Sequence, residues 1–179
     1  EGGGDKYNNM VVVKDKKIAQ NYEIEFQEFW KSIFNGGPES PVVDIGESSE
    51  QITSFFCPED ECHVRVQEEL LKAKKSINFM TLSIKDNGIG DVLVQKQVEG
   101  VTVKGIYEHD KKNEGKSEYA KLIKNGIKVI TDGKNRGTFH HKVFIIDGKS
   151  VIAGSFNFRD ELQDNNIIVI RDKDTAKEY

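Results

Sequence analysis

The sequence predicts an α/β fold in which a mixed β-sheet is flanked by helices on both of its faces. Short apolar, β-branched runs alternate along the chain with runs whose apolar residues recur at helical spacing. Near the carboxyl end, two apolar runs are joined by the turn signal Asp147-Gly148, which adds an antiparallel hairpin to the sheet. With 179 residues, 36% of them hydrophobic, the chain can bury one core of this kind.

The expected elements follow one another in a regular order. Strands are expected at 52–56, 76–84, 101–108, 127–131, 143–147 and 151–155. Proline near the first turn and glycine after the last turn delimit the helices between them. Their apolar faces are Val66, Leu70 and Ala73 in the first helix, Ile89, Val92 and Leu93 in the second, and Tyr119, Leu122 and Ile123 in the third.

The most informative segment is HHKVFIIDGKSVIAGSFN at 140–157. Its polar residues follow the spacing H-x-K-x4-D-x6-G-S-x-N, with six fixed identities, which is far more specific than most short motifs. These six residues are His140, Lys142, Asp147, Gly154, Ser155 and Asn157. Side chains two apart on a strand point to one face, so His140 and Lys142 are expected together, as are Ser155 and Asn157.

An imidazole, an ammonium, a hydroxyl and a carboxamide at one point can together hold a phosphoryl group. We expect neutral His140 to attack phosphorus while Lys142 and Asn157 bind the non-bridging oxygens. Ser155 would donate a further hydrogen bond, and Gly154 would leave room for close backbone approach. Lysine and amide donors supply the charge stabilisation, so neither a metal nor another cofactor is expected.

Several of these residues have structural alternatives. A single His-x-Lys pair on a strand usually lies on a solvated face, and Asp147 can act only as the cap of a turn. His141 is expected to face away from His140 and to support it. The run 134–136, Lys-Asn-Arg, is either a solvated loop or a contact for a phosphate backbone.

The spacing of this motif resembles the HKD signature of the phospholipase D superfamily. The order of elements from 51 to 179 is also similar to the phospholipase D-like fold. The resemblance implies a metal-independent phosphodiesterase that forms a phosphohistidine, with two HKD halves facing each other. It also implies an acidic residue shortly before the strand that follows the motif, which orients a histidine of the facing half. Asn165 occupies the aligned place, and Asp164 is the nearest acid.

An internal repeat fits the same resemblance. NNMVVVKDKKIAQNY at 8–22 aligns without gaps with NNIIVIRDKDTAKEY at 165–179, with seven identities in fifteen. Each copy predicts a buried strand followed by a helix that starts at aspartate. In the first copy the helix continues, with Tyr22, Phe26, Phe29 and Ile33 expected to pack in the core.

Three regions are therefore expected. Residues 1–35 form the tail of a preceding HKD-like half, 36–50 a linker rich in glycine, proline and serine, and 51–179 an HKD domain that lacks its final helix. The partner is then a second HKD half, either an N-terminal portion of the same protein or an identical chain. A catalytically silent half that acts as a binding or scaffold module is the alternative from another functional class.

Composition limits the substrate only weakly. The net charge of −4 argues against broad, nonspecific nucleic-acid binding, and no apolar run is long enough to cross a membrane. The phosphodiester could belong to a nucleic acid, which we favour slightly, or to a phospholipid. Cys57 and Cys62 could be free thiols or a short disulfide, so the compartment stays open.

Overall fold

The computed structural model describes residues 5–38, 51–133, 137–159 and 163–179. Their centre is a seven-stranded mixed sheet in the order β2-β9-β8-β7-β3-β4-β5. The strands β3, β4 and β5 are parallel neighbours, and the other pairings are antiparallel. The strands are β2 (Gln51–Cys57), β3 (Ser76–Thr81), β4 (Thr102–Tyr107), β5 (Lys128–Thr131), β7 (Lys142–Ile146), β8 (Ser150–Gly154) and β9 (Asn165–Arg171).

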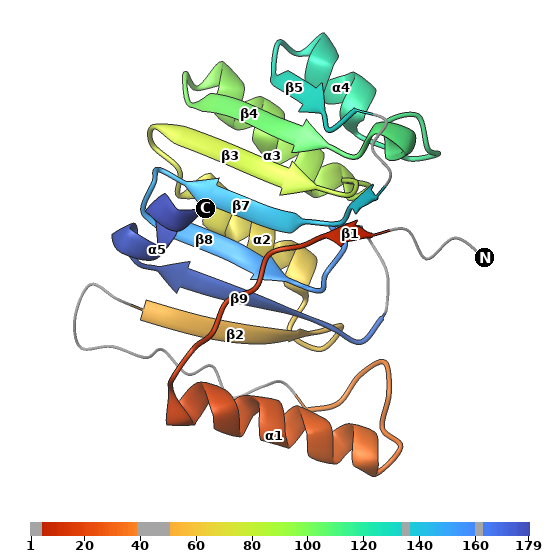
Figure 1. The fold of residues 1–179 in the computed structure, drawn as a ribbon, viewed down its shortest axis with the longest axis vertical. Helices are drawn as coiled ribbons and strands as arrows, with labels where there is room; N and C mark the ends of the chain where they lie inside the picture. The colour runs from red at the N-terminus through yellow and green to blue at the C-terminus, as the bar shows by residue number, and fades with distance from the viewer. Residues whose placement is uncertain (1–4, 39–50, 134–136, 160–162) are drawn as a thin grey trace.

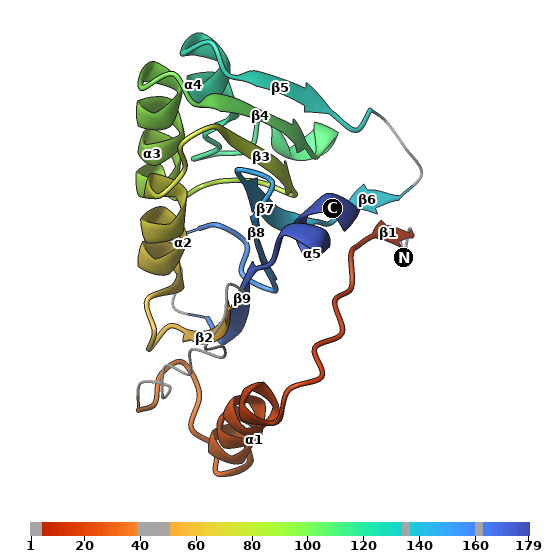
Figure 2. The same ribbon diagram turned by 90° about the vertical axis from the view of Figure 1, so that its left-hand side faces the viewer.

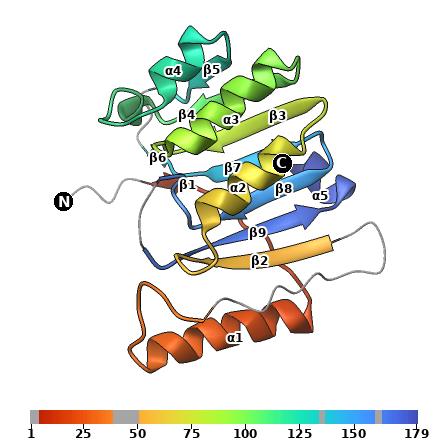
Figure 3. The same cartoon turned by 180° about the vertical axis from the view of Figure 1, so that it is seen from behind.

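Helices lie on both faces of this sheet, as the sequence predicted. Figures 2 and 3 show α2 (Cys62–Leu71), α3 (Asn87–Val98) and α4 (Tyr119–Lys124) side by side on one face. The opposite face carries the short helix α5 (Lys173–Glu178), and α1 (Lys16–Trp30) lies beyond the β2 edge (Figure 1). A short 3-10 helix, η1 (His109–Lys111), follows β4. The mixed α/β fold is thereby confirmed.

Two cores form because each face of the sheet buries alternate residues. The larger core lies under α2, α3 and α4 and contains Val66, Leu70 and Leu93, each fully buried. The smaller core lies on the opposite face around Val143, Val151 and Ile168, and Ala176 of α5 packs on it. Residues 5–15, which precede α1, are called the N-terminal segment below. Val11 and Val13 of this segment pack against the second core, as does Tyr179.

The two copies of the repeat adopt different structures. The second copy forms β9 and then α5, as expected. The first copy was also expected to form a buried strand, and this prediction is wrong. Residues 8–15 have no strand, and just before them β1 (Lys6–Tyr7) pairs with β6 (Thr138–Phe139). An extended segment becomes a strand only when a neighbouring segment supplies backbone hydrogen bonds. β9 pairs with β2 on one side and with β8 on the other. Among the described residues, the first copy has no such strand neighbours over 8–15.

The prediction for the aromatic side of α1 is also wrong. Its buried residues are Ile18, Asn21 and Glu25, whereas Tyr22 and Phe26 are exposed. The helix ends at Trp30, so Ile33 lies beyond it. The reason is the way α1 docks on the edge of the sheet, where the Asn21 side chain donates to the hydroxyl of Ser54 on β2 at 3.2 Å.

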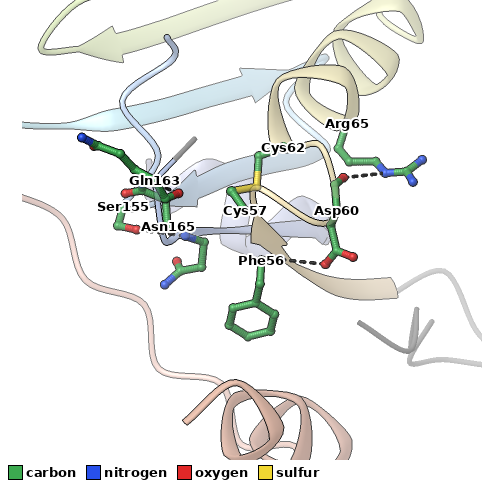
Figure 4. Close-up of a disulfide and its surroundings, with 9 residues drawn as sticks. Phe56, Cys57, Asp60, Cys62, Arg65, Ser155, Gln163 and Asn165 are labelled. Atoms are coloured by element: carbon green, nitrogen blue, oxygen red, sulfur yellow. Dashed lines mark hydrogen bonds between the residues drawn. A yellow bond between two sulfur atoms is a disulfide. The ribbon is translucent and has the colours of Figure 1, made fainter. Parts of the chain in front are cut away.

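A disulfide between Cys57 and Cys62 closes the turn from β2 into α2 (Figure 4). Of the two states that the sequence left open, free thiols or a short disulfide, the structure has the disulfide. Both cysteines are buried, with 5.5 Å between their Cα atoms. Within the same turn, the carboxylate of Asp60 accepts from the backbone N–H of Phe56 at 2.8 Å. The turn is thus fixed by a covalent link and by a buried hydrogen bond.

Candidate functional site

The β7–β8 hairpin brings the motif residues to one end of the sheet. Val143 pairs with Ala153, so His140 and Lys142 enter the hairpin where Ser155 and Asn157 leave it. At the far end, Asp147 and Gly148 both have positive φ values of 55° and 60°, as a type I′ turn requires. The expected hairpin and its turn are therefore present.

Asp147 lies at this far end and serves the fold. Its carboxylate accepts from the backbone N–H groups of Lys74, Lys75 and Ser76 at 2.7 to 2.9 Å. Burial alone would raise the pKa of Asp147, but these three donors outweigh burial and hold the pKa below its usual range. The structure thus places Asp147 as a clamp between the hairpin turn and the start of β3.

The other motif residues line one cavity of about 660 Å³. One side is polar and contains His140, Lys142, Ser155 and Asn157, next to Gly154. Another part is apolar and is formed by the sheet face, the N-terminal segment and α1, with Val11, Val13, Ile18, Ala153 and Ile168. The four polar residues that the sequence predicted to lie together therefore line one cavity, and their chemical role stays a prediction.

Lys142 is the most buried polar residue of this group, at 5% exposure. Its Nζ lies 3.2 Å from Nδ1 and 3.3 Å from Nε2 of His140, and 3.1 Å from the His140 carbonyl oxygen. Burial, followed by the nearby positive charges of Lys6 and Arg159, lowers the pKa of Lys142 to about 8. The amine is therefore mostly protonated at neutral pH and is poised to lose its charge just above it.

The imidazole of His140 is biased towards its neutral form. Partial burial lowers its pKa, and the charges of Lys142, Lys6 and His141 lower it further. Because the ordinary pKa of histidine is already below 7, His140 is predominantly neutral at pH 7. A neutral imidazole can act as a nucleophile, and it cannot give up a proton as an imidazolium does.

Ser155 and Gly154 owe their positions to β9. The Ser155 hydroxyl accepts from the backbone N–H of Asn166 at 2.9 Å, which leaves its own hydrogen free to donate into the cavity. A Cβ at Gly154 would collide with the backbone oxygen of Asn166. Glycine is thus required here for the close backbone approach that the sequence suggested.

Asp164, the acid nearest to the place of the orienting residue, does not line the cavity that contains His140. Its carboxylate accepts from the backbone N–H of Asn35 at 2.6 Å and lines a separate cavity beside α1. Besides Lys142, the imidazole of His140 has Asn8 as a neighbour, whose Oδ1 lies 3.2 Å from Nδ1. His141 has an equivalent contact, 3.1 Å, with Oδ1 of Asn9, and does not line the cavity.

Asn8 was not among the residues that the motif singled out, although the repeat contained a signal for it. Asn8 aligns with Asn165, the residue at the place where the family resemblance implies an orienting side chain. Nothing in the sequence showed that the first copy of the repeat would fold back on His140. The run 134–136 lies outside the described residues.

One group of potential metal ligands occurs among the described residues. Carboxylate oxygens of Glu25, Glu28 and Glu59 lie within 4.8 Å of one another, away from the cavity that contains His140. Burial, followed by the charges of Glu59 and Glu28, raises the pKa of Glu25 to about 7. In the described part of the chain, no helix is long and apolar enough to span a bilayer.

Comparison with known proteins finds a matching family model and several relatives of this chain. A family model described as "Cardiolipin synthase, PLD-like domain" matches residues 66–179. A phospholipase D of Rickettsia felis is 30% identical over 153 residues, which cover 83% of this chain and 76% of the relative. A mitochondrial cardiolipin hydrolase of Chlamydomonas reinhardtii is 30% identical over 111 residues, or 60% of this chain and 49% of that protein.

Comparison of the fold with solved structures also finds a phospholipase D family member. The crystal structure of a phospholipase D family member, Nuc from Salmonella typhimurium, superposes with a TM-score of 0.65 at 29% identity. The superposition covers 72% of this chain and 88% of that one. The region matched by the family model, residues 66–179, includes the β7–β8 hairpin.

Proposed function

The chain belongs to the phospholipase D superfamily, and from this premise we propose that it hydrolyses phosphodiester bonds through a phosphohistidine intermediate on His140. The observation that carries the proposal is the shared cavity of His140, Lys142, Ser155 and Asn157. The cavity combines a neutral imidazole, a buried ammonium and two neutral donors. This set of groups suits a tetrahedral anion whose charge shifts during the reaction.

The reaction has two displacements at phosphorus. First, the lone pair of a His140 ring nitrogen forms an N–P bond while the P–O bond to the leaving group breaks. The leaving oxygen takes a proton from a general acid. A water then forms a new P–O bond as the N–P bond breaks, and its proton returns to the same acid–base group. Lys142 and Asn157 bind the non-bridging oxygens throughout.

We propose that the general acid comes from outside the described residues of this cavity, with Lys142 kept as a ligand of the phosphoryl oxygens. His140 is predominantly neutral at pH 7, so a second, protonated histidine is needed on the other side of the phosphate. We propose that a facing HKD half provides it, either from the same protein or from an identical chain. The exposed side of the N-terminal segment, with Met10 and Val12, is a surface on which such a half could pack.

For the substrate, we propose first a nucleic acid. Burial lowers the pKa of Lys142, and the positive charges of Lys6 and Arg159 add to this effect, so positive charge gathers beside the phosphoryl position. A polyanionic backbone would be drawn to this charge although the net charge of the chain is −4. Tyr7, which is 47% exposed next to Asn8, offers a surface for base stacking.

A phospholipid is the second candidate, and one observation favours it. The cavity continues from the polar site along an apolar wall that includes Val11, Val13 and Ile168. Such a wall suits an acyl chain better than a sugar–phosphate backbone. The relatives named phospholipase D and cardiolipin hydrolase add weight to this candidate.

One experiment separates these candidates. Purified protein in EDTA is offered fluorescent single-stranded DNA, RNA, and vesicles of phosphatidylcholine with cardiolipin. We expect cleavage of one of these substrate classes, with single-stranded nucleic acid as the first choice. The cleavage rate should fall by about 10³-fold or more in His140→Ala. Trapping of ³²P on the wild-type protein after an acid-free quench would report the phosphohistidine directly.

The matched control is His141→Ala, because His141 is adjacent in sequence but does not line the cavity. It should retain cleavage within about tenfold. Cleavage of lipid alone would replace the first substrate by the second. Absence of all cleavage by a protein shown to contain two facing HKD halves would contradict the enzymatic proposal and favour the scaffold alternative.

A further inference from the structure

A second cavity, of about 350 Å³, lies between α1, the end of β2 and the start of β9, and we call it the side cavity. Three residues line both the side cavity and the cavity that contains His140, and they are Tyr22, Ser155 and Asn166. Ser155 is one of the residues proposed to hold the phosphoryl group. A substrate whose phosphate is held there therefore has its neighbouring atoms at the border of the side cavity.

The apolar walls of the side cavity are aromatic. They consist of Tyr22, Phe26 and Phe29 of α1 and Phe56 of β2. The Phe56 ring points towards α1 (Figure 4), and its centroid lies 4.8 Å from that of Tyr22 in an edge-to-face pair. Phe26 is 52% exposed, so part of its ring is open to a ligand. Exposed aromatic rings of this kind stack on other planar groups.

The polar groups of the side cavity are carboxyls and amides. They belong to Glu25, Asp164, Asn165 and Asn166. Burial, followed by the charges of Glu59 and Glu28 and then of Asp164, raises the pKa of Glu25, so negative charge gathers at this place. A second phosphate group is repelled from such a cavity. A neutral group that carries hydrogen-bond donors is favoured, because carboxylate oxygens accept.

The two cavities thus differ in charge. In the cavity of His140, Lys6 and Arg159 add positive charge beside Lys142, which suits a phosphate. The side cavity is aromatic and acidic, which suits an uncharged, planar group with hydrogen-bond donors at its edge. In a single-stranded nucleic acid, the base of each nucleotide is such a group. Proteins bind unpaired bases by stacking them on aromatic side chains and by hydrogen bonds to their edges.

We propose that the side cavity binds the base of the nucleotide next to the scissile phosphate, and that it prefers cytosine or adenine to thymine or uracil. This rests on the proposed nucleic-acid substrate. The base would stack on the aromatic walls that Tyr22 and Phe26 provide. Cytosine and adenine carry an amino group that can donate to the carboxyls of Glu25 and Asp164. Thymine and uracil present a carbonyl oxygen at the same place, which a carboxylate repels.

Binding can be measured without cleavage. The His140→Ala protein is titrated in a calorimeter with short homopolymers of deoxycytidine and of thymidine at one fixed salt concentration, because salt changes the affinity for any polyanion. We expect the deoxycytidine polymer to bind at least about fivefold more tightly, as a side-chain contact that distinguishes bases would produce. Phosphocholine is titrated in parallel as the head group of a zwitterionic lipid.

Two further variants, each made in the His140→Ala protein, test the two kinds of wall. Phe26→Ala should weaken the binding of both polymers by about fivefold or more, because it removes a stacking surface. Asp164→Asn should reduce the preference for deoxycytidine, since the amide keeps an acceptor for the Asn35 N–H but has no charge. Ile24→Ala is the matched control, because Ile24 is 43% exposed on the same helix and lines neither cavity. Circular dichroism establishes that each variant is folded.

Cleavage of the two polymers by the protein with His140 intact gives the second readout. The deoxycytidine polymer should be cut faster by a similar factor, and Asp164→Asn should reduce that ratio. Equal binding of the polymers, a preference unchanged in Asp164→Asn, or tighter binding of phosphocholine than of either polymer would overturn the assignment of the side cavity. Cleavage of nucleic acid without any base preference would overturn it too, while the proposed function would stand. Selective binding that depends on Asp164 and Phe26, in a protein that cleaves nothing, would instead refute only the proposed function.

Discussion

The two copies of the repeat share seven of fifteen residues and yet end in different environments. In the second copy, Val169 lies fully buried in β9 between two neighbouring strands. In the first copy, its equivalent Val12 is 70% exposed in a segment with no strand. The comparison shows that the same residues encode an extended backbone in both places, whereas the neighbours decide whether that backbone becomes part of a sheet.

The largest expected difference between the copies concerns these two valines. Val169→Ala should lower the free energy of unfolding by about 2–3 kcal/mol, because it opens a cavity in a fully buried position. Val12→Ala should change it by less than about 0.5 kcal/mol. Urea denaturation followed by circular dichroism measures both. Equal losses in the two variants would mean that the first copy is also buried, for instance against a second chain.

The next effect concerns the disulfide at the end of β2, the strand that pairs with β9 of the second copy. The Cys57–Cys62 disulfide ends β2, and Cys57 lies opposite Asn165 at the start of β9. Closing so short a loop stabilises a fold by about 2 kcal/mol in the chain-entropy model. Urea denaturation with and without a reductant should show this loss in the wild type. The Cys57→Ala, Cys62→Ala double variant should be insensitive to the reductant, and a wild type that is also insensitive would contradict the prediction.

A smaller effect distinguishes the helix of the first copy. The pKa of Glu25 is raised to about 7 by burial and by Glu59 and Glu28, so the folded protein holds a proton that the unfolded chain releases near pH 4.5. The stability that this proton contributes is present below about pH 4.5 and is lost as the pH rises through about 7. We expect α1 to exchange its amide hydrogens with a lower protection factor at pH 8 than at pH 5, after correction for intrinsic exchange.

The control for this titration lies on the same helix. Glu25→Gln should remove most of the difference between the two pH values. Glu23→Gln should retain the difference, because Glu23 is exposed and accepts from Gln27 on the helix surface. If Glu25→Gln and the wild type show the same pH dependence in α1, the raised pKa of Glu25 is not the cause.

The smallest effects concern the aspartate caps, the feature that the copies share most closely. Asp15 accepts from two backbone N–H groups at the start of α1, as Asp172 does at the start of α5. Asp172→Ala should melt the six-residue α5, whereas Asp15→Ala should fray only the first turn of the fifteen-residue α1. Amide exchange resolves the two helices, and Asp172→Asn should restore α5 because asparagine is also an effective cap.

The Asp172 cap also predicts how the stability of α5 depends on pH. The side chain of Thr175, followed by the backbone N–H groups of Thr175 and Asp174, lowers the pKa of Asp172 below its usual range. The contribution of this cap is complete above the usual pKa of aspartate and is lost as the pH falls through the lower folded value. Protection of α5 should therefore persist at pH 4 and decline below it.

The sequence by itself determined the elements of the domain and the identity of its chemical groups. Apolar spacing predicted α2, with Val66 and Leu70 at its core, and the turn signal Asp147-Gly148 predicted the hairpin. These features follow from local periodicity and from the positive φ that a type I′ turn demands, both of which lie within a few residues of chain. The polar set of His140, Lys142, Ser155 and Asn157 followed from the same local register.

Tertiary structure alone decided the surroundings of that set. The contact of Asn8 with His140 joins residues 132 positions apart, and it depends on backbone pairing between segments that show no mutual signal in the sequence. Whether Val12 or Val169 enters a sheet, and whether Tyr22 or Glu25 faces the core, likewise depends on which neighbour occupies the adjacent space. The pattern of side chains in a segment determines which backbone conformation it favours. Whether the segment is buried or paired depends on the neighbouring segments in the folded structure.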